Sequence, residues 1–538
     1  MSEPVHGGVI AVRALKSLGV EHLFVLTGGH IFPFLDAART EGLRIADFRH
    51  EQSAGYAAEA WSRLTRTLGV CAVTAGPGVT NIMSPLAQAG FNSASVLALA
   101  GRAPTYRWGQ GSLQEIDHVP FVAPLAEAKT VQTTDAIAEE ILAAARRALI
   151  PPRGPQFLDF PLEVLFNTAS VETNAPDAGR DEAATFEQAG EVARLIEHAQ
   201  RPVLVAGSNV WLDRAEQALR ALVEAAEIPT IMNGQGRGCL PADHRLAFAR
   251  SRSAAFKQAD LVIVAGAPLD FRLGFGQGFA PDAKVVHLDP GPVVEHVPLA
   301  VTTNPTRLDV SLAAIASEIG TASDTKPWIE ALRAVEEDNY AQAQEELRSD
   351  ARPIHPMRLY GELVPLLERN AVVIGDGGDF VSYAGREVPS FEPGCWLDPG
   401  PYGCLGCGPG YAMAARLAHP DRQIVLLLGD GAIGFSGTEL ETMVRLKLPI
   451  VCVVGNNGIW GLEKHPMRAL YGHDVAAELQ PGIRYDLMME SFGGRGELVE
   501  DPDDIGPALK RAFDAGEPYL VNVLTDPEIA YPRSANLA

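Results

Sequence analysis

Residues 424–431 read Ile-Val-Leu-Leu-Leu-Gly-Asp-Gly, a continuous apolar run that ends in two glycines around an aspartate. An unbroken apolar run of this length is typical of a parallel β-strand that is buried on both faces. A helix-like stretch (438–447) and a second apolar run (450–454) follow, and the second run leads into Asn456 and Asn457. The pattern predicts a strand, a crossover helix and a second, parallel strand in one sheet.

The same alternation of strand-like and helix-like stretches runs along nearly the whole chain. Apolar runs at 203–206 and 261–267 have the composition of further buried parallel strands. A chain of 538 residues is also too long for one hydrophobic core. We therefore expect an α/β protein of three doubly wound parallel-sheet domains with a C-terminal tail, divided at polar stretches into residues 1–166, 186–345, 355–525 and 526–538.

Composition excludes several classes of partner. The formal net charge is −23, which argues against nucleic-acid binding, because that requires a basic surface. The apolar runs are far shorter than the roughly 20 residues that cross a bilayer, so we expect no membrane partner. No basic segment followed by an apolar one opens the chain, so we expect a cytoplasmic protein. Six cysteines are too few for a disulfide scaffold, and Cys404 and Cys407 lack the further ligands of a zinc site.

Asp430 and Asn457 follow directly on the two strands of the opening motif. Ligands of open parallel sheets bind at the carboxyl ends of the strands, where these two side chains are expected to lie. A carboxylate and an amide oxygen suit Mg²⁺, which also prefers phosphate oxygens. The glycines allow backbone N–H groups to approach a diphosphate at the start of a helix. Gly429-Asp430-Gly431 alone fits an ordinary turn in which the aspartate caps a helix. Together with Asn456 and Asn457, it predicts a site for a metal ion and a diphosphate.

This pair of motifs, with Asn457 standing 27 positions after Asp430, resembles the signature of thiamine-diphosphate (ThDP) enzymes. The resemblance implies that Asp430, Asn457 and the carbonyl of Ile459 bind Mg²⁺. It also implies that Leu405 wedges the cofactor into its bent conformation, while the Gly403 carbonyl accepts a hydrogen bond from the 4′-amino group. Further residues that the resemblance places at the cofactor are Gly429, Gly431, Ala432 and Gly461.

Residues 47–60 resemble the activating motif of the same enzymes. The resemblance assigns Glu51 to the hydrogen bond with pyrimidine N1′ that makes the 4′-amino group a base. Residues 74–81, with Gly76 and Asn81, follow a strand and open a helix, and they resemble a second backbone nest of this superfamily. The resemblance covers nearly the whole chain. It implies a homodimer or homotetramer, with each cofactor between the first domain of one subunit and the third of another.

Shorter stretches bear on the substrate. Residues 28–31 and 113–118 resemble benzaldehyde lyase and 2-hydroxyacyl-CoA lyases, which implies that His30 and Gln114 contact the substrate hydroxyl or carbonyl. Residues 434–442 resemble oxalyl-CoA decarboxylases and 2-hydroxyacyl-CoA lyases, and the tail resembles the end of some acyl-CoA lyases. Further residues that we expect near the substrate are Glu115, Trp460, Arg533 and Asn536.

Two features leave alternatives open. Residues 375–380 and 396–398 resemble acetolactate synthases, which match the chain over its whole length as well. In relatives the central domain holds ADP, FAD or nothing, and ADP is favoured over FAD here. The residues that could bind this nucleotide are Gly207, Asn209, Arg250, Arg252 and Asp289, although an empty scaffold domain fits the sequence too.

On these grounds we expect a ThDP- and Mg²⁺-dependent 2-hydroxyacyl-CoA lyase. It would cleave a 2-hydroxyacyl-CoA to formyl-CoA and an aldehyde or ketone, and it would also run in reverse, with His30 or a water oriented by Gln114 as the base. An acetolactate synthase acting on pyruvate is the alternative. An oxalyl-CoA decarboxylase or a carboligase like benzaldehyde lyase is a second one. A non-catalytic paralogue is disfavoured because Glu51, Asp430 and Asn457 are all present.

Overall fold

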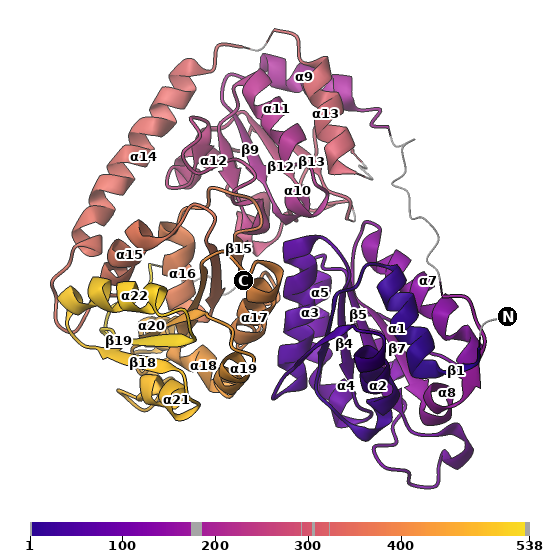
Figure 1. The fold of residues 1–538 in the computed structure, drawn as a ribbon. Coiled ribbons are helices and arrows are strands. Elements are labelled where there is room, and N and C mark those ends of the chain that lie inside the picture. Colours follow the sequence, from indigo (N-terminus) through magenta and orange to yellow (C-terminus); the bar gives the residue numbers. More distant parts are fainter. Residues whose placement is uncertain (1–2, 174–184, 292, 304–306, 322, 533–538) are drawn as a thin grey trace.

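The computed structural model describes residues 3–173, 185–291, 293–303, 307–321 and 323–532. Three parallel sheets follow one another along the chain, each with helices on both faces (Figure 1). This arrangement confirms the predicted fold class. No helix in the described part of the chain combines the length and the apolar character that crossing a membrane requires.

The N-terminal sheet has six parallel strands. In spatial order they are β3 (Arg44–Asp47), β2 (His22–Val25), β4 (Gly69–Val73), β5 (Val96–Arg102), β7 (Gln156–Pro161) and β6 (Glu127–Thr130). One face is covered by α1 (Gly7–Ser17), α2 (Phe32–Thr40), α7 (Ile137–Leu149) and α8 (Leu162–Phe166). The other face carries α3 (Glu51–Thr65) and α5 (Met83–Phe91). The short α4 (Pro77–Asn81) and α6 (Val119–Val122) lie in connections, and β1 (Val5–His6) pairs antiparallel with β8 (Thr168–Ala169).

The central sheet has five parallel strands. Their order is β11 (Ala247–Phe248), β10 (Thr230–Met232), β9 (Pro202–Ala206), β12 (Leu261–Ala265) and β13 (Lys284–Leu288). One face packs against α9 (Ala189–His198), α10 (Ser208–Leu212), α11 (Glu216–Ala226) and α13 (Leu308–Glu318). The other face packs against α12 (Arg252–Gln258) and the start of α14 (Lys326–Leu347), the long helix that leads to the third domain (Figure 1).

The C-terminal sheet again has six parallel strands. Their order is β15 (Trp396–Leu397), β14 (Val372–Asp376), β16 (Ile424–Gly429), β17 (Val451–Asn456), β19 (Tyr519–Leu524) and β18 (Arg495–Val499). One face carries α15 (Pro356–Leu363), α16 (Gly378–Glu387) and α22 (Ile505–Asp514). The opposite face carries α17 (Gly408–Ala418), α19 (Glu439–Arg445) and α21 (Tyr485–Ser491). The helices α18 (Asp430–Ser436) and α20 (Gly461–Tyr471) begin at the carboxyl edge of the sheet.

The opening motif folds as a strand, crossover and parallel strand. β16 and β17 pair in register, with Gly429 opposite Gly455, so Asp430 and Asn457 both lie just beyond the same sheet edge. The crossover differs from the expectation of one helix, because a short helix, α18, begins at Asp430 ahead of α19.

The N-terminal and C-terminal domains share one hydrophobic core. Ala54, Tyr56 and Ala57 of α3 belong to the same buried cluster as Tyr411 and Ala415 of α17. The rings of Tyr56 and Tyr411 meet edge to face, with centroids 6.3 Å apart. The small side chains of α3 allow this close packing, so the two outer domains form one unit within the chain.

Candidate active site

Asp430 is held at the end of β16 by backbone N–H groups. Its Oδ1 accepts from Gly431 N at 3.0 Å, and its Oδ2 accepts from Gly458 N at 2.6 Å. The residue is only 4% exposed, and burial raises the pKa of its carboxyl to about 6. The described residues give it no cationic side chain as a partner. A buried carboxylate without a counter-charge is a group that a divalent cation would stabilise.

Asn457 points into the same region, whereas its neighbour Asn456 is structural. The Nδ2 of Asn457 donates to Asp379 Oδ2 at 3.3 Å, and its Oδ1 accepts from Ile459 N at 3.2 Å. The side chain of Asn456 is turned inward, where it donates to Ile483 O and Asn522 Oδ1. Asp379 was not among the expected residues, although the Gly-Asp-Gly-Gly-Asp run at the end of β14 contained it. Burial also raises the pKa of this second carboxyl.

The residues present fit a divalent cation and a diphosphate. Asp430 and Asn457 supply oxygen donors at the ends of adjacent strands, and neither oxygen has all its lone pairs in use. The described residues include no group of three or more His, Cys, Asp or Glu side chains that could hold a metal. A set built from one carboxylate, one amide and the Ile459 carbonyl does not require such a group.

Two glycines keep the backbone at this edge close to its neighbours. A Cβ on Gly431 would lie 2.4 Å from the Trp460 ring, and a Cβ on Gly461 would lie 2.3 Å from the Asp379 carboxylate. Neither position could carry a side chain without displacing these groups. Gly429 and Ala432 flank Asp430 on β16 and α18, so the structure brings the whole expected diphosphate set to one place.

A cavity of about 520 Å³ opens beside this edge. Gly403, Leu405 and Trp460 line it together with Arg272 from the central domain. Gly403 has a φ of 74°, a conformation that favours glycine. The cavity is therefore shared by the expected cofactor-bending segment and one of the expected substrate residues.

Glu51 is the first residue of α3 and is only 7% exposed. Its Oε2 accepts from Asn81 Nδ2 at 3.0 Å, so the two residues that the sequence assigned to the cofactor are in direct contact. The backbone N–H groups of Arg49 and His50 donate to Glu439 of α19. The third domain of the same chain thus fixes the turn that presents Glu51.

His30 and Gln114 meet through the hydroxyl of Thr74. Thr74 Oγ1 donates to Gln114 Oε1 at 3.1 Å and lies 3.3 Å from His30 Nδ1. Since the hydroxyl has a single proton, its oxygen is placed to accept from His30 Nδ1–H, and the ring also makes a hydrogen bond with the Leu113 backbone. Burial, with a smaller contribution from the neighbouring His118 ring, lowers the pKa of His30 below 6.5. The imidazole is therefore neutral, and a potential base, at neutral pH.

His118 is a residue of this region that sequence reasoning missed. Its Nε2 accepts from Gly76 N at 2.9 Å, so its Nδ1–H donates to Asp159 Oδ2 at 2.8 Å. Arg102 pairs with the same carboxylate at 2.9 Å. A Cβ on Gly76 would lie 2.9 Å from the Cβ of Gln114. His118 therefore fixes the Gly76 peptide against which Gln114 packs.

The remaining substrate candidates are distributed differently. Glu115 accepts from Gly109 N and Ser112 N, so its carboxylate closes its own loop. Trp460 lines the cavity beside Leu405. Arg533 and Asn536 lie outside the described residues.

The expected nucleotide residues fall into two groups. Gly207, Asn209 and Asp289 lie at the carboxyl edge of the central sheet, where Asn209 Nδ2 donates to Asp289 Oδ2 at 3.0 Å. The cavity beside Gly207 and Asn209 measures about 30 Å³, which is far too small for an adenine nucleotide. Arg250 and Arg252 line a larger cavity of about 910 Å³, and Arg272 lines both cavities. The assignment of these five residues to a nucleotide stays a prediction.

Glu51, His30 and Gln114 belong to the N-terminal domain, whereas Asp430, Asn457 and Leu405 belong to the third. Among the described residues, no hydrogen bond or ion pair links the first three to the last three.

Comparison with known proteins identifies all three domains. Residues 5–121 match the N-terminal TPP binding domain of thiamine pyrophosphate enzymes, residues 189–297 match their central domain, and residues 376–523 match their C-terminal TPP binding domain. The acetolactate synthase large subunit IlvG of Mycobacterium tuberculosis is 50% identical over 548 residues, covering 100% of this chain and 99% of the relative. The 2-hydroxyacyl-CoA lyase 2 of Bos taurus is 32% identical over 577 residues, covering 96% and 90%. The chain belongs to the family of thiamine-diphosphate-dependent enzymes.

Proposed function

We propose that this enzyme is an acetolactate synthase, which joins two pyruvate molecules to 2-acetolactate with release of CO₂. The observation that carries the proposal is 50% identity over the whole chain to two mycobacterial proteins that bear this name. The 2-hydroxyacyl-CoA lyases that the sequence motifs favoured are only 31–32% identical. The relatives therefore support the alternative over the lyase that we expected first.

The chain's own residues would divide the work as follows. Bound ThDP supplies a nucleophilic carbon and an electron sink for decarboxylation. Asp430, Asn457 and the Ile459 carbonyl would hold its metal and diphosphate, and Glu51 would share a proton with its pyrimidine ring. The imidazole of His30 would take or return a proton at the substrate oxygen, with Thr74 and Gln114 fixing the ring.

Product analysis tests this proposal. Purified enzyme loaded with ThDP and Mg²⁺ is incubated with pyruvate, and acetolactate and CO₂ are quantified by chromatography and mass spectrometry. The proposal predicts equimolar acetolactate and CO₂. Bound ThDP without acetolactate formation would rule out this substrate and leave the cofactor assignment intact.

A second candidate, 2-hydroxyacyl-CoA lyase, is favoured by the cavity of about 910 Å³ between α12, α14 and α16. Its lining includes a single acidic side chain, Glu346, and five cationic ones, namely Arg250, Arg252, Lys257, Arg272 and Arg386. Among the described residues Arg252 has no carboxylate within ion-pair distance, and its guanidinium donates only to the Arg272 carbonyl. Burial and the nearby Arg272 lower the pKa of Arg252. An anionic ligand would relieve this repulsion.

Arg272 links this cationic cavity to the cofactor cavity, because it lines both. A substrate with a phosphate-bearing end, such as an acyl-CoA, could place that end near Arg252 and its thioester near Leu405. Three of these cations already pair with carboxylates, namely Arg250 with Glu387, Arg272 with Asp270, and Arg386 with Glu346 and Glu387. Arg252 is therefore the cation of this cavity on which the candidate depends. Free ADP could use the same arginines, and calorimetry with ADP in the absence of substrate would detect it.

Formyl-CoA and acetone distinguish the two candidates. If the lyase is correct, the enzyme forms 2-hydroxyisobutyryl-CoA, and Arg252→Gln raises the KM for formyl-CoA about 10-fold with little change in kcat. Ser253→Ala, on the same cavity wall, is the matched control. If the enzyme converts pyruvate but not formyl-CoA and acetone, and Arg252→Gln does not change that rate, the synthase is favoured.

A further inference from the structure

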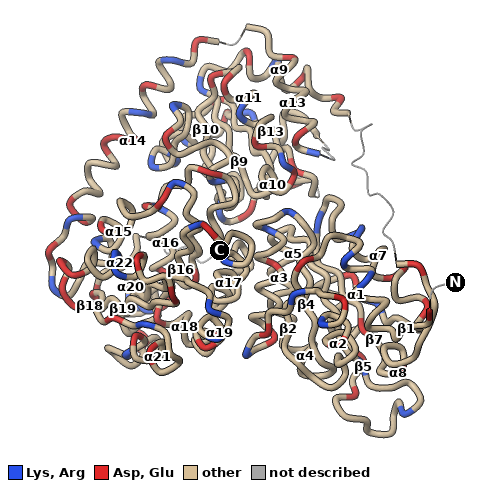
Figure 2. Tube along the Cα trace, viewed as in Figure 1, with Lys and Arg blue, Asp and Glu red and all other residues tan. Residues whose placement is uncertain are grey.

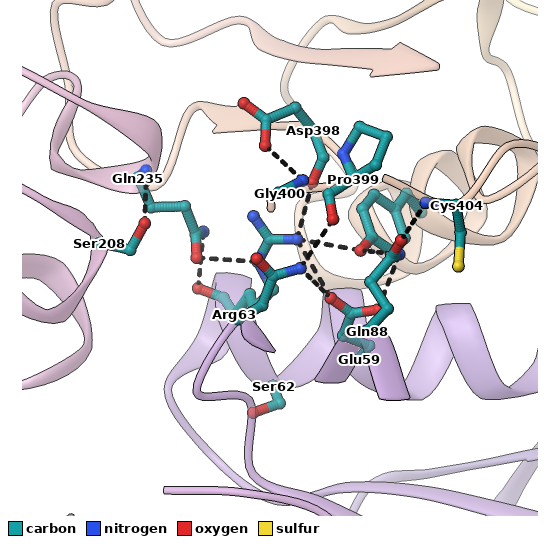
Figure 3. Close-up of polar contacts among 12 residues, drawn as sticks. Glu59, Ser62, Arg63, Gln88, Ser208, Gln235, Asp398, Pro399, Gly400 and Cys404 are labelled. Atoms are coloured by element: carbon teal, nitrogen blue, oxygen red, sulfur yellow. Dashed lines mark hydrogen bonds and ion pairs between the residues drawn. The ribbon is translucent and has the colours of Figure 1, made fainter. Parts of the chain in front are cut away.

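The loop that carries Gly403 and Leu405 is held by side chains of another domain. It runs from Asp398 to Cys407, between β15 and α17. Three side chains of the N-terminal domain bond to its backbone, and two of them, Arg63 and Gln88, are labelled in Figure 3. The three bonds are Arg63 Nη1 to Asp398 O at 3.0 Å, Asn92 Nδ2 to Pro399 O at 3.1 Å, and Cys404 N to Gln88 Oε1 at 3.1 Å.

The other side of the loop is held from within the third domain. Asp376, the last residue of β14, is fully buried and accepts from Gly406 N at 3.1 Å and from Gly408 N at 2.7 Å. Leu405 therefore lies between two residues whose backbone N–H groups donate to buried side chains. Cys404 N donates to Gln88, and Gly406 N donates to Asp376. Gly403 and Gly406, with φ of 74° and 81°, give the loop conformational freedom that these bonds remove.

Glu59 fixes the orientation of Gln88. Its carboxylate is fully buried and accepts from Gln88 Nε2 at 3.2 Å, from Asn92 Nδ2 at 2.7 Å and from Arg63 Nη1 at 3.2 Å. Gln88 Nε2 also donates to the Tyr411 hydroxyl at 2.9 Å. Because the Glu59 carboxylate only accepts, its contact with Gln88 requires the amide nitrogen, and the amide oxygen of Gln88 therefore faces Cys404 N.

We propose that Gln88 is a positioning residue for the cofactor. By accepting the Cys404 N–H, in an orientation set by Glu59, it fixes the loop from which Leu405 wedges the cofactor. The inference rests on the same cofactor site as the proposed function, with Leu405 and Gly403 in the roles that the family resemblance implies. Gln88 is fully buried and bonds to the loop backbone, so its proposed role is exerted through the loop.

Hydrogen exchange of the wild-type enzyme is the first test, because it requires no variant. Exchange of backbone amides in residues 398–408 is followed by mass spectrometry with fragmentation to single residues. We expect the Cys404 and Gly406 amides to be among the slowest of this loop. Exchange of the Cys404 amide at the rate of an exposed peptide would overturn the proposal, whatever any variant does.

Gln88→Leu, which keeps the size of the side chain and removes the acceptor, is the second test. We expect about tenfold faster exchange at Cys404, weaker ThDP binding by calorimetry, and slower exchange of the thiazolium C2 proton of bound ThDP. Gln88→Glu keeps an acceptor oxygen at the same reach, and its second oxygen can take the place of the amide nitrogen only if it shares a proton with the buried Glu59 carboxylate. It should therefore restore protection of Cys404 at a pH low enough for that proton to be bound.

Gln235→Leu is the matched control. Gln235 bonds to Arg63 at the central-domain end of the same network, through its Oε1 at 3.0 Å and its Nε2 at 3.2 Å, and it does not touch the loop. Since Arg63 holds the Asp398 end of the loop and not Cys404, we expect this variant to lower the melting temperature without altering exchange of the Cys404 amide, ThDP affinity or C2-proton exchange. If Gln88→Leu and Gln235→Leu change amide exchange, ThDP affinity and C2-proton exchange equally, Gln88 only stabilises the fold and the proposal is wrong. None of these measurements contains a substrate, so their failure is distinct from a failure of the proposed function.

Discussion

Glu51 belongs to a short sequence motif, and its buried carboxylate accepts a hydrogen bond from Asn81, 30 positions further along the chain. Its place at the start of α3 would suit an exposed carboxylate on a helix N-terminus, yet the structure buries it against Asn81. The amide of Asn81 keeps one carboxylate oxygen occupied and leaves the other available to a pyrimidine nitrogen. Burial here strengthens a hydrogen bond that water would otherwise weaken.

Replacing Glu51 with Gln should leave ThDP bound while slowing catalysis about 10²- to 10⁴-fold, because the amide retains the shape and loses the exchangeable proton. Calorimetry gives the ThDP affinity, and single-turnover kinetics give the rate. Glu41→Gln, which removes a surface carboxylate paired with Arg13, should change neither quantity. Unaltered turnover in Glu51→Gln would refute the role assigned to Glu51.

His30 should determine the acid side of the pH profile. Burial lowers its pKa from 6.5, so the neutral imidazole persists to below pH 6.5 and its base function is lost only as the pH falls further. We expect kcat/KM for the preferred substrate to decline at a pH below 6.5. His30→Gln should remove that decline and lower kcat/KM about 100-fold or more. If kcat/KM of His30→Gln declines at low pH as it does in the wild-type enzyme, the decline is caused by another group.

Candidate residues could be picked from the sequence where one short motif contains the chemistry. Asp430, Asn457 and Glu51 each belong to such a motif, and their roles stay predictions. His118 and Gln88 do not, because their partners Gly76 and Cys404 lie 42 and 316 positions away along the chain. Contacts of that kind are created by packing between elements and leave no periodic signal in the sequence.

At the level of elements, the apolar runs predicted the strands well, and the crossover after β16 was harder to predict. α18 contains Gly431 and Gly434 within seven residues, a composition of low helix propensity. The helix forms because its buried residues, among them Ala432 and Ile433, pack beneath the sheet edge. Tertiary packing here overrides the local preference.

The two glycines of α18 should respond oppositely to alanine. A Cβ at Gly431 would lie 2.4 Å from the Trp460 ring, whereas a Cβ at Gly434 would have no atom within 4 Å. We expect Gly431→Ala to destabilise the cofactor-free protein by about 1–3 kcal/mol and to disturb the cavity at Trp460. Gly434→Ala should stabilise it by about 0.4–1 kcal/mol. Thermal denaturation and tryptophan fluorescence check both, and equal shifts would contradict the close approach of the Trp460 ring to Gly431.

In the whole molecule, a buried ion pair joins the three domains. Glu59 and Arg63, 0% and 2% exposed, bond to each other in the N-terminal domain. Arg63 also reaches Gln235 of the central domain and Asp398 and Tyr411 of the third. Elsewhere, acidic and basic residues are interspersed over all three domains (Figure 2). The order of the domains followed from the family resemblance, but this junction did not, because its members are scattered over more than 300 positions.

The completed site is expected to belong to a pair of subunits. No hydrogen bond or ion pair joins Glu51 to Asp430 in the described part of the chain. The third domain holds the loop and the proposed metal residues, and the first holds Glu51, His30 and Gln114. A symmetric dimer that brings the first domain of one subunit to the third domain of the other would form two equivalent sites. Each site would then need one intact residue from each chain.

Mixing two inactive variants examines this arrangement directly. Glu51→Gln should be unable to activate the cofactor, and Asp430→Ala should bind ThDP·Mg²⁺ at least about 10- to 100-fold more weakly. Dissociated and reassembled in equal amounts, they form heterodimers in which one site contains both wild-type residues. Exchange of the thiazolium C2 proton, which needs no substrate, is then measured relative to the wild-type enzyme. We predict that fast exchange returns at about a quarter of the sites, and no recovery above the separate variants would contradict a site shared between subunits.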